Sequence, residues 1–250
     1  MAGMSGVLSM LLMDVQALIA ILPIEDRSAI PEFTPLIKIL SLLQPAMILA
    51  VAAVIGTALA PAVGLRSPAA EAAASGENVM PALGPQILPG IIGGIIGGAA
   101  IVLTAAMWTP VLPQDVVETV SQFQNLTPLT MRLLYGGITE EILIRWGLMT
   151  LLVWAGFRFF QKGRSRPGTA VFAAAILISS LTFGIAHLPL AFLLVPEPTA
   201  PLIFYVIAAN SLFGFVAGFL YWKRGLESAI IAHMTAHLVM YAASQFGAYF

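Results

Sequence analysis

The sequence predicts an all-α fold, a polytopic membrane helix bundle of about seven to eight transmembrane helices. Hydrophobic residues fill 59% of the 250 positions and charged residues only 9%, whereas soluble domains carry roughly 25% charged residues. Apolar runs of about 20 residues, the length that crosses a bilayer, recur between breaks rich in Pro, Gly or charge. We therefore read residues 1–250 as a single transmembrane domain.

The apolar runs give the expected helices in order. The N-terminal run lacks the basic flank of a signal peptide, so we expect it to be retained as the first span. The segment 61–85 reads as a mobile connection and the polar segment 113–125 as a short interfacial helix or loop. Residues 1–110 would supply accessory helices and residues 129–247 a core. The expected spans are 7–22, 35–59, 88–108, 129–160, 169–187, 202–222 and 227–246.

Glycine patterns predict where helices approach each other closely. The third expected span carries Gly90, Gly94 and Gly98 on one stripe, and the sixth carries Gly214 and Gly218. Glycines four residues apart allow two helix backbones to approach closely. These stripes predict packing and say nothing about chemistry.

The distribution of charge predicts the orientation of the chain. A net charge of -1 without a long basic run gives no indication of a nucleic-acid partner. Basic residues follow the fourth and sixth expected helices, and the positive-inside rule places that side, and with it the N-terminus, in the cytoplasm. The absence of cysteine excludes thiol catalysis, thiolate metal sites and disulfides. The basic residues are Arg158, Lys162, Arg164, Arg166, Lys223 and Arg224.

The fourth expected helix carries Glu140, Glu141 and Arg145 inside an apolar run. Ionisable side chains are costly in a bilayer and mark functional sites or tightly paired groups. At about 100° per residue, Arg145 shares a face with Glu141, while Glu140 points about 100° away. We therefore expect Arg145 to hold Glu141, and Glu140 to face a cavity as a base. The alternative is a structural ion-pair cluster that holds helices together.

All three histidines fall in the expected spans. His187 ends the fifth helix, and His233 and His237 lie four residues apart in the seventh. That spacing places two imidazoles on one helical face, where they can meet one metal ion or one water. With Glu140 they form a set of one carboxylate and three imidazoles, which predicts a functional site.

Other classes of membrane protein fit these residues less well. Met234 stands where a His-Glu-x-x-His zinc protease needs its glutamate. The chain lacks the Gly-x-Ser-Gly nucleophile of a rhomboid, the paired intramembrane aspartates of an aspartyl protease and the many histidines of a di-iron desaturase. A proton-coupled carrier that relays protons through the same Glu and His groups stays open.

Three motifs follow one another on successive helices: Glu140-Glu141-x-x-x-Arg145, Phe183-x-x-x-His187 and His233-x-x-x-His237. In this order they resemble the CAAX-protease and bacteriocin-processing family of intramembrane proteases, which includes the CAAX prenyl endopeptidases. The resemblance covers roughly residues 135–240 and implies that residues 129–247 form a catalytic core. It departs from the family at His237, where Asn is common.

The resemblance implies an intramembrane endopeptidase in which Glu140 activates a water and His187 orients that water or shuttles its proton. His233 and His237 would donate hydrogen bonds to the developing oxyanion or bind a zinc ion. Both a zinc site and a site without a cofactor stay open. The candidate catalytic residues are Glu140, Glu141, Arg145, His187, His233 and His237, and the candidate zinc ligands are Glu140, His187, His233 and His237.

The resemblance also implies the partners. The substrate would be a peptide or lipidated protein, cleaved after a lipidated cysteine in the CAAX manner or at another membrane-associated peptide bond. The lipid bilayer would surround a multi-pass protein, and the short loops suggest a prokaryotic plasma membrane. Some prokaryotic family members act in bacteriocin immunity, so a non-proteolytic immunity protein is an alternative.

The depths of the histidines conflict with this simple arrangement of spans. His187 would lie roughly 26 Å from the cytoplasmic start of the fifth helix, whereas His237 would lie about 15 Å into the seventh. The two residues can meet only if the seventh helix begins inside the bilayer, if the fifth is tilted or broken, or if the expected boundaries are wrong.

Overall fold

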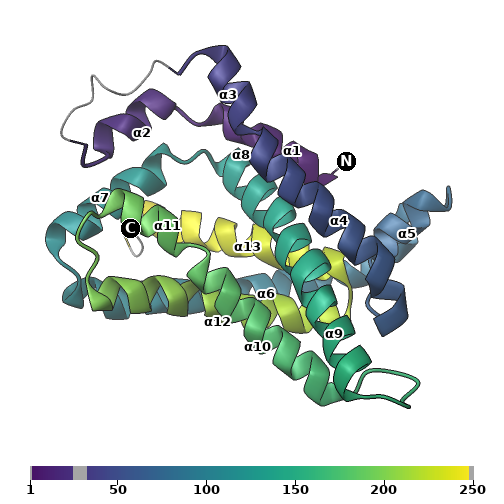
Figure 1. The fold of residues 1–250 in the computed structure, drawn as a ribbon. Helices are drawn as coiled ribbons and strands as arrows, with labels where there is room; N and C mark the ends of the chain where they lie inside the picture. The colour runs from purple at the N-terminus through teal and green to yellow at the C-terminus, as the bar shows by residue number, and fades with distance from the viewer. Residues whose placement is uncertain (1, 25–32, 248–250) are drawn as a thin grey trace.

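The computed structural model describes residues 2–24 and 33–247, and every regular element in these ranges is a helix (Figure 1). The predicted all-helical fold is therefore confirmed. The charged end expected for the first span, Glu25 to Arg27, lies outside the described residues.

The first expected span is broken into two helices. The segment α1 (Ala2–Ser9) with η1 (Met10–Leu12) meets α2 (Val15–Ile21) at a bend of 64°. Asp14 causes the break, because its carboxylate accepts hydrogen bonds from the backbone N–H groups of Gln16 and Ala17. An aspartate in this position starts a new helix, so the single helix expected over 7–22 is wrong.

The expected connection 61–85 is also largely helical. After α3 (Pro35–Ser41) and α4 (Leu43–Val63), the chain forms α5 (Pro68–Ala74) and enters α6 (Val79–Trp108). Pro85 and Pro89, which suggested a boundary, lie inside α6. Membrane helices tolerate proline because neighbouring groups satisfy the freed backbone.

The remaining helices follow the expected order. The interfacial segment forms α7, and the fourth span is continuous over the expected residues Leu129–Phe160. The elements are η3 (Thr109–Val111), α7 (Gln114–Leu126), α8 (Leu129–Met131), η4 (Arg132–Glu140), η5 (Ile142–Met149), α9 (Thr150–Phe160), α10 (Thr169–Ile185), α11 (Leu188–Leu194), α12 (Ala200–Lys223) and α13 (Leu226–Gln245).

Among the described residues, 5 helical segments are long and apolar enough to cross a membrane, or up to 6 if the bent pair α1–α2 counts as one span. The chain is thus a polytopic membrane bundle with fewer such segments than the seven to eight expected. The seventh expected helix is present as α13, but it is not among these segments. Glu227, His233 and His237 make α13 more polar than the other spans, and α13 lies inside the bundle, against α6, α12 and η4 (Figure 1).

The glycine stripe of α6 faces α13. A Cβ atom on Gly90 would lie 2.7 Å from Ile231 Cβ, and one on Gly98 would lie 2.9 Å from Val239 Cβ. Gly94 meets Thr235 in the same way. Because any side chain here would force the helices apart, the expected close packing is confirmed.

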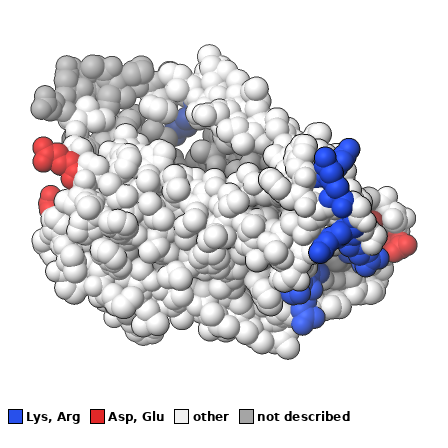
Figure 2. Space-filling view, turned by 60° about the horizontal axis from the view of Figure 1, so that its bottom comes forward, with Lys and Arg blue, Asp and Glu red and all other residues white. Residues whose placement is uncertain are grey.

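Positive charge gathers at one end of the bundle. The α9–α10 and α12–α13 connections, which carry most residues of the two basic clusters, lie at the same end in Figure 1. Figure 2 shows Lys and Arg side chains mainly at one end of the face drawn. The two clusters therefore share a side, as the sequence predicted, and its assignment to the cytoplasm stays a prediction.

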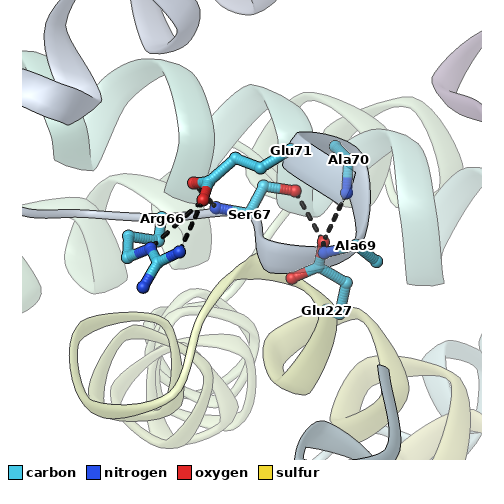
Figure 3. Close-up of polar contacts among 6 residues, drawn as sticks. All are labelled: Arg66, Ser67, Ala69, Ala70, Glu71 and Glu227. Atoms are coloured by element: carbon cyan, nitrogen blue, oxygen red, sulfur yellow. Dashed lines mark hydrogen bonds and ion pairs between the residues drawn. The ribbon is translucent and has the colours of Figure 1, made fainter. Parts of the chain in front are cut away.

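Residues 66–71 are fastened to the start of α13. One carboxylate oxygen of Glu227 accepts hydrogen bonds from Ser67 Oγ at 2.7 Å, Ala69 N at 2.9 Å and Ala70 N at 3.2 Å (Figure 3). Glu227 is buried. We call residues 66–71 together with Glu227 the α13 latch.

The latch also contains an exposed ion pair. Arg66 Nη2 lies 2.8 Å from Glu71 Oε2, and the other oxygen of Glu71 accepts a hydrogen bond from Ser67 N (Figure 3). The hydrogen bond and the charge of Glu71 raise the pKa of Arg66. Exposed pairs of this kind contribute at most about 1 kcal/mol, so we assign the fastening to Glu227.

Candidate active site

The helix over Leu129–Phe160 positions both glutamates and the arginine. Its hydrogen bonding is of the π type over Arg132–Glu140 and Ile142–Met149. This corrects the regular α-helix assumed from the sequence. Segments of π-helix are rare and occur frequently at functional sites.

Glu141 and Arg145 form the predicted pair. Arg145 Nε lies 3.3 Å from Glu141 Oε2, and both side chains are fully buried. The guanidinium also donates from Nη2 to Gly214 O at 3.2 Å and lies 5.1 Å from the ring centre of Phe183. Arg145 therefore joins the helix of the glutamates to α10 and α12.

His233 lies between the two glutamates. Its Nδ1 is 2.9 Å from Glu141 Oε1, and its Nε2 is 3.9 Å from Glu140 Oε2. A carboxylate that is paired with a guanidinium accepts hydrogen bonds, so Nδ1 donates to Glu141 and Nε2 of the neutral ring carries the lone pair. The imidazole thus presents a proton acceptor toward Glu140.

His237 stacks on His233, with ring centres 4.9 Å apart and planes 10° apart. Both nitrogens of His237 are buried and make no hydrogen bond to the described residues. Gly136 makes room for this ring, because a Cβ there would clash with Nε2 of His237. Buried polar atoms are rarely left without a partner, and each such case calls for an explanation.

His187 lies where helix five is interrupted, at the turn between α10 and α11. Its Nδ1 donates to Phe183 O at 2.7 Å, which leaves Nε2 as an acceptor. The Phe183 ring contacts His187 at 4.7 Å and His233 at 5.8 Å between ring centres. The interruption lies at the end of the expected fifth helix, and Thr169–Leu194 still counts as one candidate span, so the interruption does not change the expected depth of His187.

A cavity of about 330 Å³ joins these groups. Its wall includes Glu140 and all three histidines, while Glu141 and Arg145 lie behind that wall. The Glu140 side chain is 21% exposed and that of Glu141 is 0% exposed. The geometry predicted for the two glutamates, one facing a cavity and one paired, is therefore confirmed. We call Glu140, Glu141, Arg145, His187, His233 and His237 the Glu–His cluster.

Within residues 2–24 and 33–247, no three His, Asp or Glu side chains converge as metal ligands must. The imidazoles of His233 and His237 stack face to face, and Nδ1 of His187 is bonded to its own helix. This arrangement of donors does not fit a zinc ion, which the sequence left open beside a site without a cofactor, and no chemical step below uses a metal. Whether the protein binds zinc stays a prediction for metal analysis.

Sequence reasoning missed several residues of the cavity. Arg132 and Tyr135 precede Glu140 on the same helix, and Asn210 and Phe213 come from α12. The Phe213 ring lies 4.3 Å from that of His233. A signal was present only for Arg132, because it is a further ionisable residue within an expected span.

Comparison with known protein families finds one match, which covers part of the chain. Residues 122–239 match the family model described as type II CAAX prenyl endopeptidase Rce1-like. No curated protein and no solved structure matches the chain. The matched segment contains the whole Glu–His cluster.

Proposed function

The chain belongs, through residues 122–239, to the Rce1-like type II CAAX prenyl endopeptidases, a protease family, and from this premise we propose that it is an intramembrane endopeptidase. The observation that carries the proposal is the placement of Glu140. Its carboxylate lies on the cavity wall 3.9 Å from His233 Nε2. Glu141 contacts Nδ1 of that histidine, and Arg145 pairs with Glu141.

Hydrolysis would begin with water activated by Glu140. The carboxylate takes one proton from the water, and the water oxygen attacks the carbonyl carbon of the peptide bond. His233, oriented by Glu141, accepts a hydrogen bond from the water at Nε2, so the water would be held between His233 and Glu140. The proton then passes from Glu140 to the amide nitrogen, the C–N bond breaks, and a carboxylic acid and an amine result.

In this mechanism His237 would bind the developing oxyanion, and His187 would carry the proton. The buried nitrogens of His237 have no hydrogen-bond partner among the described residues, so a donor from this ring can stabilise the developing oxyanion without breaking another bond. His187 presents an acceptor nitrogen to the same cavity and would shuttle the proton. Arg145 and Glu141 act through His233 as positioning residues.

The substrate in this proposal is a membrane-associated peptide, with a lipidated cysteine before the cleaved bond as the first choice. The cavity lining supports this choice, because apolar side chains from α7, α11, α12 and α13 surround the polar groups. These side chains include Val120, Phe123, Leu190, Leu194, Val206 and Met240.

The test is cleavage of a defined peptide by the purified full-length protein in detergent. A peptide with a prenylated cysteine followed by three apolar residues is incubated with the wild type and with Glu140→Gln, and products are identified by mass spectrometry. We expect cleavage by the wild type, a loss of about 10²- to 10⁴-fold in Glu140→Gln, and equal folding of the two proteins. Equal activity of both proteins would refute the assignment of the base.

A proton-coupled carrier would use the same groups and give another result. It would leave every peptide intact, and in sealed vesicles the wild type, but not Glu140→Gln, would move protons together with a solute. Vesicle pH measurements beside the cleavage assay therefore separate the two functions.

A further inference from the structure

Charge divides the bundle into two ends. Most of the 11 basic residues of the sequence are exposed near the α9–α10 and α12–α13 connections, and Arg66 joins them because its carbonyl accepts a hydrogen bond from Leu226 N. The opposite end holds α7 and the α11–α12 connection (Figure 1), which expose Asp115, Glu118 and Glu197. Figure 2 likewise shows Asp and Glu side chains at the end opposite the main group of Lys and Arg. We call these the basic end and the acidic end.

The catalytic cavity extends from the Glu–His cluster toward the acidic end. The fourth span lines it with its first part, up to Glu140, and α10 contributes Phe183 from its last turn. The lining residues of α12 run from Leu202 to Phe213, and those of α13 begin at His233. Residues of α7 and α11, which lie at the acidic end, complete the wall (Figure 1).

Toward the basic end, a buried layer closes the bundle. Met149, Thr150 and Val153 follow Arg145 along the same helix and are 0% exposed. Tyr221 of α12 is 1% exposed, and its hydroxyl is hydrogen-bonded to that of Thr150 at 2.7 Å. The α13 latch covers the start of α13 at the same end. This layer separates the Glu–His cluster from the basic end, so a peptide reaches the cavity from the acidic side.

The acidic end also holds a second, polar cavity of about 270 Å³. It shares Gln124 and Thr127 with the catalytic cavity. Its wall includes Asn125, Tyr241 and Gln245, which are all exposed. Amide and hydroxyl groups form hydrogen bonds with water and with peptide groups. The polar cavity can therefore admit the water that hydrolysis consumes and the backbone of a peptide.

The basic end indicates the orientation of the bundle in the membrane. Short loops rich in Lys and Arg stay in the cytoplasm, and the α9–α10 connection is such a loop, with Lys162, Arg164 and Arg166. This predicts that the basic end faces the cytoplasm and that the acidic end, with the cavity, faces the other side.

We propose that the catalytic cavity opens to the extracytoplasmic side of the membrane and that its substrate is a peptide that has crossed the membrane. This inference rests on the proposed endopeptidase function and adds a place in a reaction sequence. A transport step must supply the substrate before cleavage, and a lipid group on the substrate would lie in the outer leaflet.

The first experiment determines which end of the bundle faces outward. The sequence contains no cysteine, so an introduced cysteine is the only thiol of the full-length protein. Gln122→Cys lies at an exposed position of α7, and Ser165→Cys lies at an exposed position of the α9–α10 connection. A membrane-impermeant maleimide is added to spheroplasts that express either variant. We expect labelling of Gln122→Cys in intact spheroplasts and of Ser165→Cys only after lysis.

A third cysteine tests the cavity itself. Asn210→Cys lies in the cavity wall on α12, and its matched control is Ser180→Cys, at a fully buried position that faces α12. A small charged thiosulfonate, which does not cross the bilayer, should modify Asn210→Cys when added outside and Ser180→Cys from neither side. Each signal is divided by the labelling of the same variant in denaturant, so differences in the amount of protein cancel.

Cleavage is then measured in sealed membrane vesicles of both orientations. The probe is a peptide with a prenylated cysteine, three apolar residues after it and a charged dye before it, which keeps the peptide from crossing the bilayer. We expect the wild type to cleave the probe in right-side-out vesicles, and in inside-out vesicles only after detergent is added. Glu140→Gln is the control that should cleave the probe in neither.

Three results would overturn the assignment of the cavity to the outer side. Intact spheroplasts could label Ser165→Cys and protect Gln122→Cys, Asn210→Cys could react only with reagent at the cytoplasmic face, or inside-out vesicles alone could cleave the probe without detergent. If the wild type in detergent cleaves no peptide, the endopeptidase proposal fails, and the labelling of the three cysteines still decides which side the cavity faces.

Discussion

Two buried glutamates contact or belong to α13, and their partners differ in kind. Glu227, in the latch, gives one oxygen to three neutral donors: a hydroxyl and two backbone N–H groups. Glu141 faces a guanidinium on one side and an imidazole on the other. Neutral donors hold a carboxylate in place, whereas a titratable partner lets the carboxylate influence where a proton resides.

The groups that bind Glu227 and the groups of the Glu–His cluster come from different parts of the sequence. Residues 66–71, which include the start of α5, lie outside the segment matched by the protease family and contact Glu227 across about 160 positions of sequence. The Glu–His cluster lies wholly inside that segment. Residues 66–71 therefore hold the start of α13, while the residues of the Glu–His cluster belong to the matched segment.

The largest effect on stability is expected for Glu141→Gln. The change leaves Arg145 buried and without its counter-charge, and breaking a buried pair costs about 3 to 5 kcal/mol. Denaturant unfolding in detergent should show this loss, with Glu140→Gln as the matched control that unfolds near the wild type. If Glu140→Gln unfolds more readily than Glu141→Gln, the roles given to the two glutamates are reversed.

A smaller effect is expected for Glu227→Ala. The buried hydroxyl of Ser67 loses its acceptor, and one unsatisfied buried group costs about 1 to 3 kcal/mol. The N–H groups of Ala69 and Ala70 are only partly buried, so water can replace the carboxylate there. Cleavage per folded molecule should stay at the wild-type value, because the bond between Glu141 and His233 persists. A fall in turnover beyond the loss of folded protein would show that the latch also sets the geometry of the histidines.

The smallest effect is expected for His237→Asn, which introduces the residue common in the family. An amide can donate a hydrogen bond as an imidazole does, so activity should remain and chelators should have no effect. Elemental analysis of the wild type and the variant provides the check. A zinc content near one per chain that falls together with activity in the variant would contradict the metal-free mechanism proposed here.

Local features of the fold and the site could be predicted from the sequence. The bounds of Leu129–Phe160 follow from hydropathy, and the pairing of Glu141 with Arg145 follows from their four-residue spacing. The π-type hydrogen bonding of that helix could not be predicted, because a shift of backbone partners leaves no pattern in side-chain polarity. The break at Asp14 was missed although a capping residue stood there.

Contacts between distant segments were beyond sequence reasoning. Glu227 reads as an ordinary acidic residue in the first turn of a helix, and nothing in its surroundings points to Ser67. Arg132 reads as one more ionisable residue within an expected span, and only the fold places it in the wall of the cavity of the Glu–His cluster. Periodicity reports which face of a helix is polar, but the identity of the partner depends on how the helices cross.

The glycine stripe of α6 leaves the axial register of α13 undetermined. The residues of α13 that face this stripe repeat every four positions. If α13 moved along its axis by one helical turn, about 5.4 Å, the next residue of the repeat would face each glycine. His233 and His237 share that period, so the same slide would carry His237 to the level of Glu141. It would also carry Ile231 to the place of Glu227, where an apolar side chain cannot accept hydrogen bonds from Ser67, Ala69 and Ala70. The latch is therefore one of the contacts that break this translational degeneracy, together with the hydrogen bonds of Ser228 to Gln86 and of His233 to Glu141.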